Sequence, residues 1–393
     1  MKITHKLAFL LVFLSFPAFL FSRSPKKKAE LDTDKILEKK DALEKVLKYG
    51  THKQRKSAMY DLAKFPPEHS EDLYKILGKI IEEDRDKGVK ITAIRILAKL
   101  NRNEYAPSII EALQDTSLDV KEAAITAIQK LHVEDATDEL ITLLKEQDFT
   151  RNQKISNLLI NTLGMLENGK TAFPYLETKF KDNTTNTEIK ATIALYFGKI
   201  KITKAENCLI DAINDDSQSN TVRSYALSSL GKIRSQKALP HVRSILEKAQ
   251  NPKNKYEKQK YAPLKLYAMS ALVAIGDKKI LEDLIAYAKD DNPKIRIQAI
   301  RQLGDLHDKS VLELLQYKAK RDPNRRVRLT AKKVLEKFHQ NKPKPSGSQL
   351  KHNSTPIGKI HIDEDDTKQP QKKVIPKSEL IHSFDSTESV GSE

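Results

Sequence analysis

The sequence contains no tryptophan, one cysteine and only 12 glycines among 393 residues. A single cysteine, Cys208, excludes an internal disulfide, and no cluster of cysteine and histidine has the spacing of a structural zinc site. Scarce glycine argues against a β architecture that relies on glycine turns. The 39% hydrophobic and 31% charged residues instead fit a helical protein with a large solvated surface.

Signals of catalysis are also lacking. Neither the dinucleotide-binding pattern GxGxxG nor the hydrolase pattern GxSxG occurs. The 10 histidines are scattered along the chain rather than clustered as metal ligands. We therefore expect no enzymatic activity, no bound metal and no cofactor. Cys208 lies where a helix would bury it, so it is expected to be an inert thiol in the core.

The first residues predict an export signal rather than a part of the fold. In MKITHKLAFLLVFLSFPAFLFSRSPKKK, two lysines precede an apolar run over 7–21, and Ser22 follows before charge resumes. This is the pattern of a secretory signal peptide, here 1–22. The run is shorter than the roughly 20 residues that span a bilayer, which favours cleavage over the alternative of a retained N-terminal membrane anchor. We therefore expect an exported protein of the periplasm or cell envelope.

One apolar pattern recurs along the chain. Its positions 0, 4, 8 and 11 are apolar or small, which places them on one face of a helix with 3.6 residues per turn. Copies begin at Gln54, Val89, Val120, Ile155, Ile189, Val222, Leu264, Ile295 and Val327. So many copies exclude a catalytic signature and indicate the packing rule of a repeated structural unit.

A second amphipathic run lies between successive copies, as in ATDELITLLKEQD and KILEDLIAYAKDD. Asp, Asn, Pro or Ser usually follow it and cap the next helix. One unit is thus predicted to be two antiparallel helices, with a small residue at position 4 and Gly or Ala at position 9 where the next unit approaches. A lone helix pair buries too little surface, so the units must stack. The predicted fold class is all-α, an α-solenoid (superhelix) of about nine helix pairs over residues 34–340.

Two copies carry the specific features of a known family. DDNPKIRIQAIRQLGDL and RDPNRRVRLTAKKVLEKF have an Asp/Pro turn followed by Val or Ile and then Arg. They resemble the HEAT-repeat family, including the HEAT-like repeats of bilin lyases, over about residues 40–340. The copies at Ile155 and Leu264 lack the Asp-Pro turn. The resemblance implies a solenoid that binds other macromolecules, without fixing which ones. It also implies that the basic residue at position 1 bonds an inter-helix aspartate of a neighbouring unit, with partners such as Asp115, Asp216, Asp291 and Asp322.

The ends of the chain and one insertion depart from the repeat. Residues 23–33 are predicted to be a flexible lead and 34–50 a capping helix. Residues 341–393 are predicted to be a disordered tail, because they are rich in Pro, Ser and Lys and lack helical periodicity. The insertion EKAQNPKNKYEKQKYAPLK at 247–265 is expected to be an exposed loop. It either has no partner or contacts an acidic surface through its lysines and tyrosines.

The formal net charge of +17 suggests an anionic partner. Position 10 of the pattern is lysine in six of the nine copies, although a lysine in the last helical turn also interacts favourably with the helix dipole. The candidate anion-binding residues are Lys99, Lys130, Lys199 and Lys232 on this lysine ridge, and Lys255, Lys258 and Lys260 in the insertion. Positions 3 and 6 lie away from the buried stripe and supply the candidate partner-binding residues Tyr225, Ser228, Tyr267, Gln298 and Arg301.

The sequence therefore predicts a non-enzymatic scaffold or adaptor that binds protein partners in the cell envelope. One alternative is a basic solenoid that binds an anionic envelope polymer or lipid headgroups at a membrane surface. A second alternative is an enzyme of the HEAT-like lyase type. No nucleic-acid partner is expected of an exported protein.

Overall fold

The computed structural model describes residues 25–340, with side chains over 34–338. These residues belong to one compact unit of the chain. The predicted signal peptide (1–22) and the predicted tail (341–393) lie outside the described residues. Between 25 and 340 every regular element is helical, which confirms the all-α prediction. No helix in this part of the chain is long and apolar enough to cross a membrane.

Each of the nine copies of the apolar pattern lies mostly within one helix, which is called a first helix here. The first helices are α2 (His52–Leu62), α4 (Lys87–Lys99), α6 (Leu118–Leu131), α8 (Lys154–Leu163), α10 (Thr187–Lys199), α12 (Asn220–Ile233), α15 (Lys265–Ile275), α17 (Pro293–Leu306) and α19 (Arg325–Gln340). Consecutive first helices contact one another from α2 to α19. The prediction of a stacked repeat is therefore confirmed.

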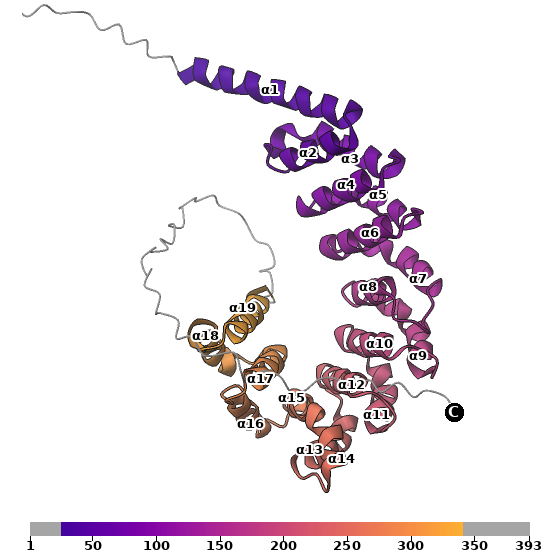
Figure 1. The fold of residues 1–393 in the computed structure, drawn as a ribbon, viewed down its shortest axis with the longest axis vertical. Helices are drawn as coiled ribbons and strands as arrows, with labels where there is room; N and C mark the ends of the chain where they lie inside the picture. The colour runs from indigo at the N-terminus through magenta and orange to yellow at the C-terminus, as the bar shows by residue number, and fades with distance from the viewer. Residues whose placement is uncertain (1–24, 341–393) are drawn as a thin grey trace, which may run out of the picture. The chain divides into compact units, whose positions relative to one another are not determined.

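A second helix follows each first helix except α19 within the described residues. The second helices are α3 (Glu71–Glu83), α5 (Ala106–Glu111), α7 (Thr137–Lys145), α9 (Phe173–Lys181), α11 (Glu206–Asn214), α13 (Leu239–Gln250), α16 (Ile280–Tyr287) and α18 (Leu312–Arg321). From α2 to α12 the first helices form one row and the second helices another (Figure 1). One additional helix, α14 (Lys255–Tyr261), lies in the insertion between α13 and α15.

The core runs along the stack without interruption. Buried apolar side chains form one cluster from Leu43 to Val334, to which every helix pair contributes. The helix α1 (Pro25–Tyr49) packs against α2 and α3 and covers the first pair with Leu43 and Leu47. A capping helix was predicted over 34–50. The predicted flexible lead over 23–33 is wrong from Pro25 onward, because PKKKAELDTDK has its proline at the first helical position and otherwise mostly good helix formers.

Small residues at position 9 of the pattern allow the first helices to approach closely. A Cβ atom built on Gly198 of α10 would lie 2.8 Å from Ser229 Cα of α12, and one built on Gly231 would lie 3.0 Å from Ala271 Cα of α15. The Ser229 hydroxyl uses this proximity to donate a hydrogen bond of 2.6 Å to the Ala194 carbonyl. The neighbouring backbone thus requires glycine at position 198, whereas a methyl group at position 231 would be a tight contact that needs a small shift of α15.

Basic residues at position 1 tie the end of a helix pair to its own first helix. Lys90 Nζ of α4 lies 2.9 Å from Asp115 Oδ2, which follows the second helix of the same pair. Arg55 pairs with Asp84 in the same way. Arg296 Nη2 of α17 lies 2.9 Å from Asp322 Oδ1, after α18. The family resemblance implied an aspartate of a neighbouring unit, but in these three cases the aspartate belongs to the same helix pair. The pairing gives these cations a structural role.

Two other position-1 residues, Arg223 and Lys190, form no ion pair with an aspartate of their own helix pair within residues 34–338. Arg223, which is buried, donates through Nε and Nη2 to the Ile213 carbonyl at 3.1 and 2.9 Å. Its Nη1 lies 3.3 Å from Asp216 Oδ1. Lys190 is also buried, and loss of hydration lowers the pKa of its ammonium despite the nearby charges of Asp182 and Asp215.

We expect Gly198→Ala to destabilise the protein by about 1 to 3 kcal/mol, because the new methyl group must displace the α12 backbone. The measurement is urea unfolding followed by circular dichroism. Gly164→Ala is the matched control, since its Cβ would meet the flexible Lys199 side chain first, at 3.1 Å from Cδ. The control is expected to be neutral or stabilising by up to about 1 kcal/mol. Equal losses in both variants would contradict the packing argument.

We also expect the carboxylate of Asp322 to make the free energy of unfolding depend on pH in the acidic range. Burial alone would raise its pKa, but hydrogen bonds from Arg296, the Asn324 backbone and Lys318 outweigh burial and lower it. A folded-state pKa below the unfolded value of about 3.9 stabilises the protein above that pH, and this stabilisation is lost as the pH falls through the folded pKa. The free energy of unfolding should therefore be level from pH 7 to about 5 and fall below about pH 4. Asp322→Asn should be less stable at pH 7 and show a shallower acid dependence; an unchanged slope would exclude Asp322 as its source.

Candidate partner-binding surface

The candidate partner-binding residues lie on three consecutive first helices. Tyr225 and Ser228 belong to α12, Tyr267 to α15, and Gln298 and Arg301 to α17. Arg301 is exposed and the other four are partly exposed. Positions 3 and 6 of the pattern therefore reach solvent, as the helical period requires, and none of these side chains fills the core.

The structure brings three of these five residues together. The rings of Tyr225 and Tyr267 meet edge to face, with 6.4 Å between their centroids and 66° between their planes. Burial first, and then the proximity of Tyr225, raise the pKa of Tyr267, while the charge of Arg301 lowers it. Ser228 and Gln298 occupy the same helices without a hydrogen bond to these three residues. Tyr225, Tyr267 and Arg301 are called the tyrosine surface below.

The lysine ridge is divided into two groups. Lys99 and Lys130 are exposed. Position 10 of the next copy is Met165, which is 45% exposed and interrupts the row of lysines. Beyond Met165, Lys199 Nζ donates a 3.0 Å hydrogen bond to Asn161 Oδ1. Part of the Lys199 side chain is exposed. Loss of hydration at its ammonium group lowers the pKa of Lys199, and the charges of Lys232 and Lys337 lower it further. Lys199 and Lys232 are thus close enough to repel each other.

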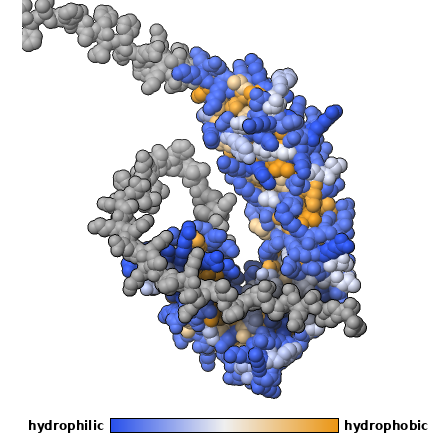
Figure 2. Space-filling view, in the orientation of Figure 1, coloured by the Kyte–Doolittle hydropathy of each residue, from blue (hydrophilic) through white to orange (hydrophobic). Residues whose placement is uncertain are grey.

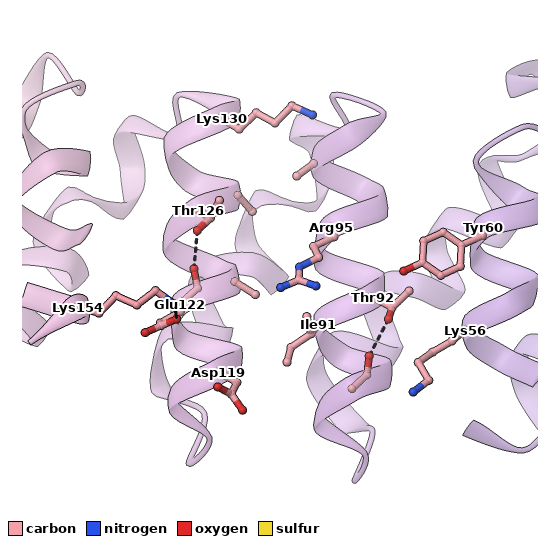
Figure 3. A pocket seen from close by; sticks show the side chains of 14 residues that line it. Lys56, Tyr60, Ile91, Thr92, Arg95, Asp119, Glu122, Thr126, Lys130 and Lys154 are labelled. Atoms are coloured by element: carbon pink, nitrogen blue, oxygen red, sulfur yellow. Dashed lines mark hydrogen bonds and ion pairs between the residues drawn. The ribbon is translucent and has the colours of Figure 1, made fainter. Parts of the chain in front are cut away.

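A groove crosses the first helices α2, α4 and α6 at the other end of the row (Figure 3). Its volume is about 620 Å³. Its basic side chains include Lys56, Arg95 and Lys130, and the exposed Tyr60 stands beside them. Sequence reasoning identified only Lys130 here. The signal that was missed is at position 6 of the pattern, which is Tyr60 in one copy and Arg95 in the next. The same rule that placed positions 3 and 6 of α12 to α17 on the surface applies to these two residues.

The surface view shows how hydrophilic and apolar residues are distributed over one face of the protein. Most of the visible face is hydrophilic, and apolar residues appear as separate patches between polar ones (Figure 2). The exposed large apolar residues over 34–338 are likewise spread over distant helices, for example Tyr60, Met165 and Tyr317. Isolated apolar residues of this kind are normal on a protein surface. Any recognition on this face therefore combines polar groups with single aromatic side chains.

The sequence of this chain matches the family model described as HEAT repeats over residues 74–158, 176–259 and 257–336. This covers more than half of the chain. The chain belongs to the HEAT-repeat family. None of the curated proteins matches it in sequence.

Solved structures with a similar fold are distant in sequence. The complex of CpcE and CpcF of phycocyanin lyase from Nostoc sp. PCC7120 is 20% identical, with 60% of this chain and 88% of that chain covered and a TM-score of 0.46. Importin beta is 13% identical, with 78% and 49% covered and a TM-score of 0.47. Human deoxyhypusine hydroxylase is 14% identical, with 79% and 100% covered and a TM-score of 0.27. At these identities the likeness concerns the fold alone.

One catalytic pattern in this HEAT-repeat protein was missed by the sequence reasoning. GMLENGKT at 164–171 matches the phosphate-binding loop GxxxxGK[ST]. That loop follows a strand and opens a helix with free backbone amides, but here the helix α8 precedes it. The amides of Glu167 and Asn168 already donate to the two oxygens of Glu134, both at 3.0 Å. A carboxylate of the protein thus occupies the amides that a phosphate would need.

Other reactive groups are held by the fold. Cys208 is buried, its thiol donates to the Ala205 carbonyl at 3.1 Å, and burial raises its pKa to about 12. A thiol of this kind is neutral and unreactive at physiological pH. Within the described part of the chain, no group of three or more His, Cys, Asp or Glu residues is arranged to hold a metal ion.

The insertion contains the helix α14 over Lys255–Tyr261 where a loop was predicted, while much of it is exposed as expected. Its last residues face inward: Tyr261 is buried, and its hydroxyl lies 3.1 Å from Asp216 Oδ1. Lys260 Nζ lies 2.9 Å from Asp216 Oδ2 and 5.3 Å from the centre of the Tyr256 ring. Lys260 is thus already paired, which argues against the prediction that it binds an external anion. Lys255 and Lys258 remain exposed.

We expect Asp216→Ala to release α14, because this single carboxylate holds both Lys260 and Tyr261. Removing it leaves Lys260, Tyr261 and the Nη1 group of Arg223 without this partner, so that local opening requires less free energy. Limited trypsin digestion followed by mass spectrometry should show faster cleavage at Lys255, Lys258 and Lys260. Asp211→Ala, in α11, is the control, since the Asp211 carboxylate makes no hydrogen bond or ion pair in the described chain. Equal cleavage rates in both variants would show that Asp216 does not anchor α14.

Proposed function

We propose that this HEAT-repeat protein is a non-enzymatic scaffold or adaptor that binds a protein partner through its row of first helices. The observation that carries the proposal is the tyrosine surface. There the rings of Tyr225 and Tyr267 meet, and the charge of Arg301, whose side chain has no hydrogen bond or ion pair within residues 34–338, acts on Tyr267. Tyrosine and arginine are the residue types that most often dominate the free energy of protein binding. The family likewise consists of stacked helices that present an extended surface to macromolecules.

Export to the cell envelope is the second part of the proposal. It rests on the N-terminal basic and apolar pattern over 1–22, which is typical of a secretory signal peptide. The same pattern leaves a membrane-anchored form as the alternative. A single cysteine is compatible with an oxidising compartment, because it cannot form an internal disulfide there.

A second candidate function is the binding of an anionic polymer or lipid headgroups. The observation that favours it is the mutual repulsion of Lys199 and Lys232, to which Lys337 contributes. A bound anion would relieve this repulsion. The same cluster also has a structural explanation, because lysine in the last turn of a helix interacts favourably with the helix dipole. The tyrosine surface therefore gives the better supported proposal.

The first test is capture of partners from the native cell envelope by the full-length protein, followed by elution along a salt gradient and mass spectrometry. We expect a discrete protein that stays bound at high salt, because burial of aromatic groups is weakly screened. Tyr225→Ala combined with Tyr267→Ala should release it, since each truncation at such a centre costs about 2 kcal/mol or more.

The control for this test replaces two exposed tyrosines outside the tyrosine surface, Tyr49→Ala and Tyr317→Ala, which are 84% and 57% exposed. This variant should retain the partner. Loss of binding in both variants would point to general destabilisation rather than a specific surface. A heterogeneous glycan or lipid fraction that elutes at moderate salt would favour the lysine ridge instead.

A further inference from the structure

The groove across α2, α4 and α6 carries positive charge that the protein itself does not neutralise. Lys56, Arg95 and Lys130 make no hydrogen bond or ion pair within residues 34–338. The two acidic residues of the groove are each paired: Asp119 lies 2.8 Å from Lys87 Nζ, and Glu122 pairs with Lys154. Free cations next to neutralised carboxylates leave the groove with a net attraction for an anionic group.

The floor of the groove is small and apolar. Ala98, Ala123 and Ala127 are buried on two adjacent helices, and Ile91 lies beside them. These short side chains let a ligand approach the helices closely, because nothing longer projects between the flanking residues. The floor therefore offers van der Waals contact along its length but no charge.

The threonine hydroxyl groups in the groove already donate hydrogen bonds within the protein. Thr92 donates to the Gly88 carbonyl at 2.7 Å, and Thr126 donates to the Glu122 carbonyl at 2.8 Å, as the dashed lines in Figure 3 show. Each bond lies within one helix, so these hydroxyl protons are not available to a ligand; Thr92 is buried and Thr126 is exposed. The polar side-chain groups left for a ligand are the guanidinium of Arg95, the two lysine ammonium groups and the hydroxyl of Tyr60.

The spacing of the helices suits an extended chain. Packed helices lie about 8–10 Å apart, and an extended peptide advances about 3.3 Å per residue. About three residues of such a peptide pass from one first helix to the next. Tyr60 and Arg95 occupy position 6 on α2 and α4, and Thr126 occupies it on α6. One peptide can thus contact Tyr60, place a carboxylate on Arg95 and continue toward Lys130.

The distribution of charge favours a peptide over a uniform polyanion. Figure 3 shows Asp119 and Glu122 at one edge of the groove, with Arg95 between them and Tyr60. A polymer or membrane surface with one charge per repeat would also place charge over the apolar floor, which offers no cation to receive it. A peptide can alternate acidic, apolar and neutral side chains and so match both the cations and the apolar floor.

We propose that the groove across α2, α4 and α6 binds an extended, acidic segment of a partner protein, with Arg95 as the main carboxylate ligand and Tyr60 as the aromatic contact. Arginine suits this role because its planar guanidinium can bond both oxygens of a carboxylate. This goes beyond the proposed function, because it assigns a second surface and states the chemistry of its ligand.

The test uses an array of synthetic peptides of about 12 residues that carry two to four glutamates at varied spacings among Ala, Ser and Leu. A matched set has glutamine in place of glutamate. Binding of the full-length protein is measured on the array, and the best peptide is then titrated in solution by fluorescence anisotropy. We expect selective binding of glutamate peptides that weakens by about tenfold or more in Arg95→Glu.

Arg321→Glu is the charge-matched control, because Arg321 is exposed on α18, away from the groove, and makes no hydrogen bond or ion pair in the described chain. It should retain the affinity of the unmodified protein. Equal binding of glutamine peptides, or equal affinities of Arg95→Glu and the unmodified protein, would overturn the proposal. So would Arg95-dependent binding to vesicles of phosphatidylcholine and phosphatidylglycerol without binding to any peptide, since the ligand would then be a lipid surface.

This result is independent of the capture experiment on the tyrosine surface. Arg95→Glu should leave a partner held by Tyr225 and Tyr267 in place. If the glutamate peptides bind through Arg95 and no envelope partner is captured, the groove stands and the proposed function fails. If a partner is captured and released by the tyrosine variants while no peptide binds, the opposite conclusion follows.

Discussion

Close approach of consecutive first helices is the constraint on which this structure depends. No helix pair covers its own apolar face, so each core position is buried only when the next first helix lies against it. At Gly198 the neighbouring backbone leaves no room even for a methyl group, and at Gly231 a methyl group would be a tight contact. The same proximity that closes the core fixes which positions of each first helix remain outside. The binding surfaces are therefore a consequence of the packing rule.

Much of this fold is predictable from the sequence because the packing rule repeats. The positions 0, 4, 8 and 11 located all nine first helices, since a period of 3.6 residues allows one buried face. The start of α1 at Pro25 was missed because that segment has helix-forming residues but no copy of the apolar pattern to mark it. Helix α14 was missed for a different reason. It is held by Asp216, far away in the sequence, and the local pattern of lysines and tyrosines resembles a solvated loop.

The candidate surfaces were predictable only in part. The sequence shows that Tyr225 and Tyr267 are both at position 3, but their ring contact depends on how closely α12 and α15 approach. The groove is less predictable still. It exists because alanines on α4 and α6 meet beneath Arg95, and no single copy of the pattern contains that combination. The pattern GMLENGKT shows the opposite error, since a motif that matches letter by letter has its amides bonded to Glu134.

Net charge alone is a poor guide to what this protein binds. Lys90, Arg223 and Arg296 contribute to the charge of +17, yet each is bonded to a carboxylate or carbonyl of the protein itself. Lys260 is also paired, although the sequence places it in the most basic segment. A cation attracts a ligand only if no internal acceptor holds it. Arg95, on an exposed helix face with its acidic neighbours paired to other lysines, meets that condition, and for this reason the position of unpaired cations identifies a binding surface better than their number does.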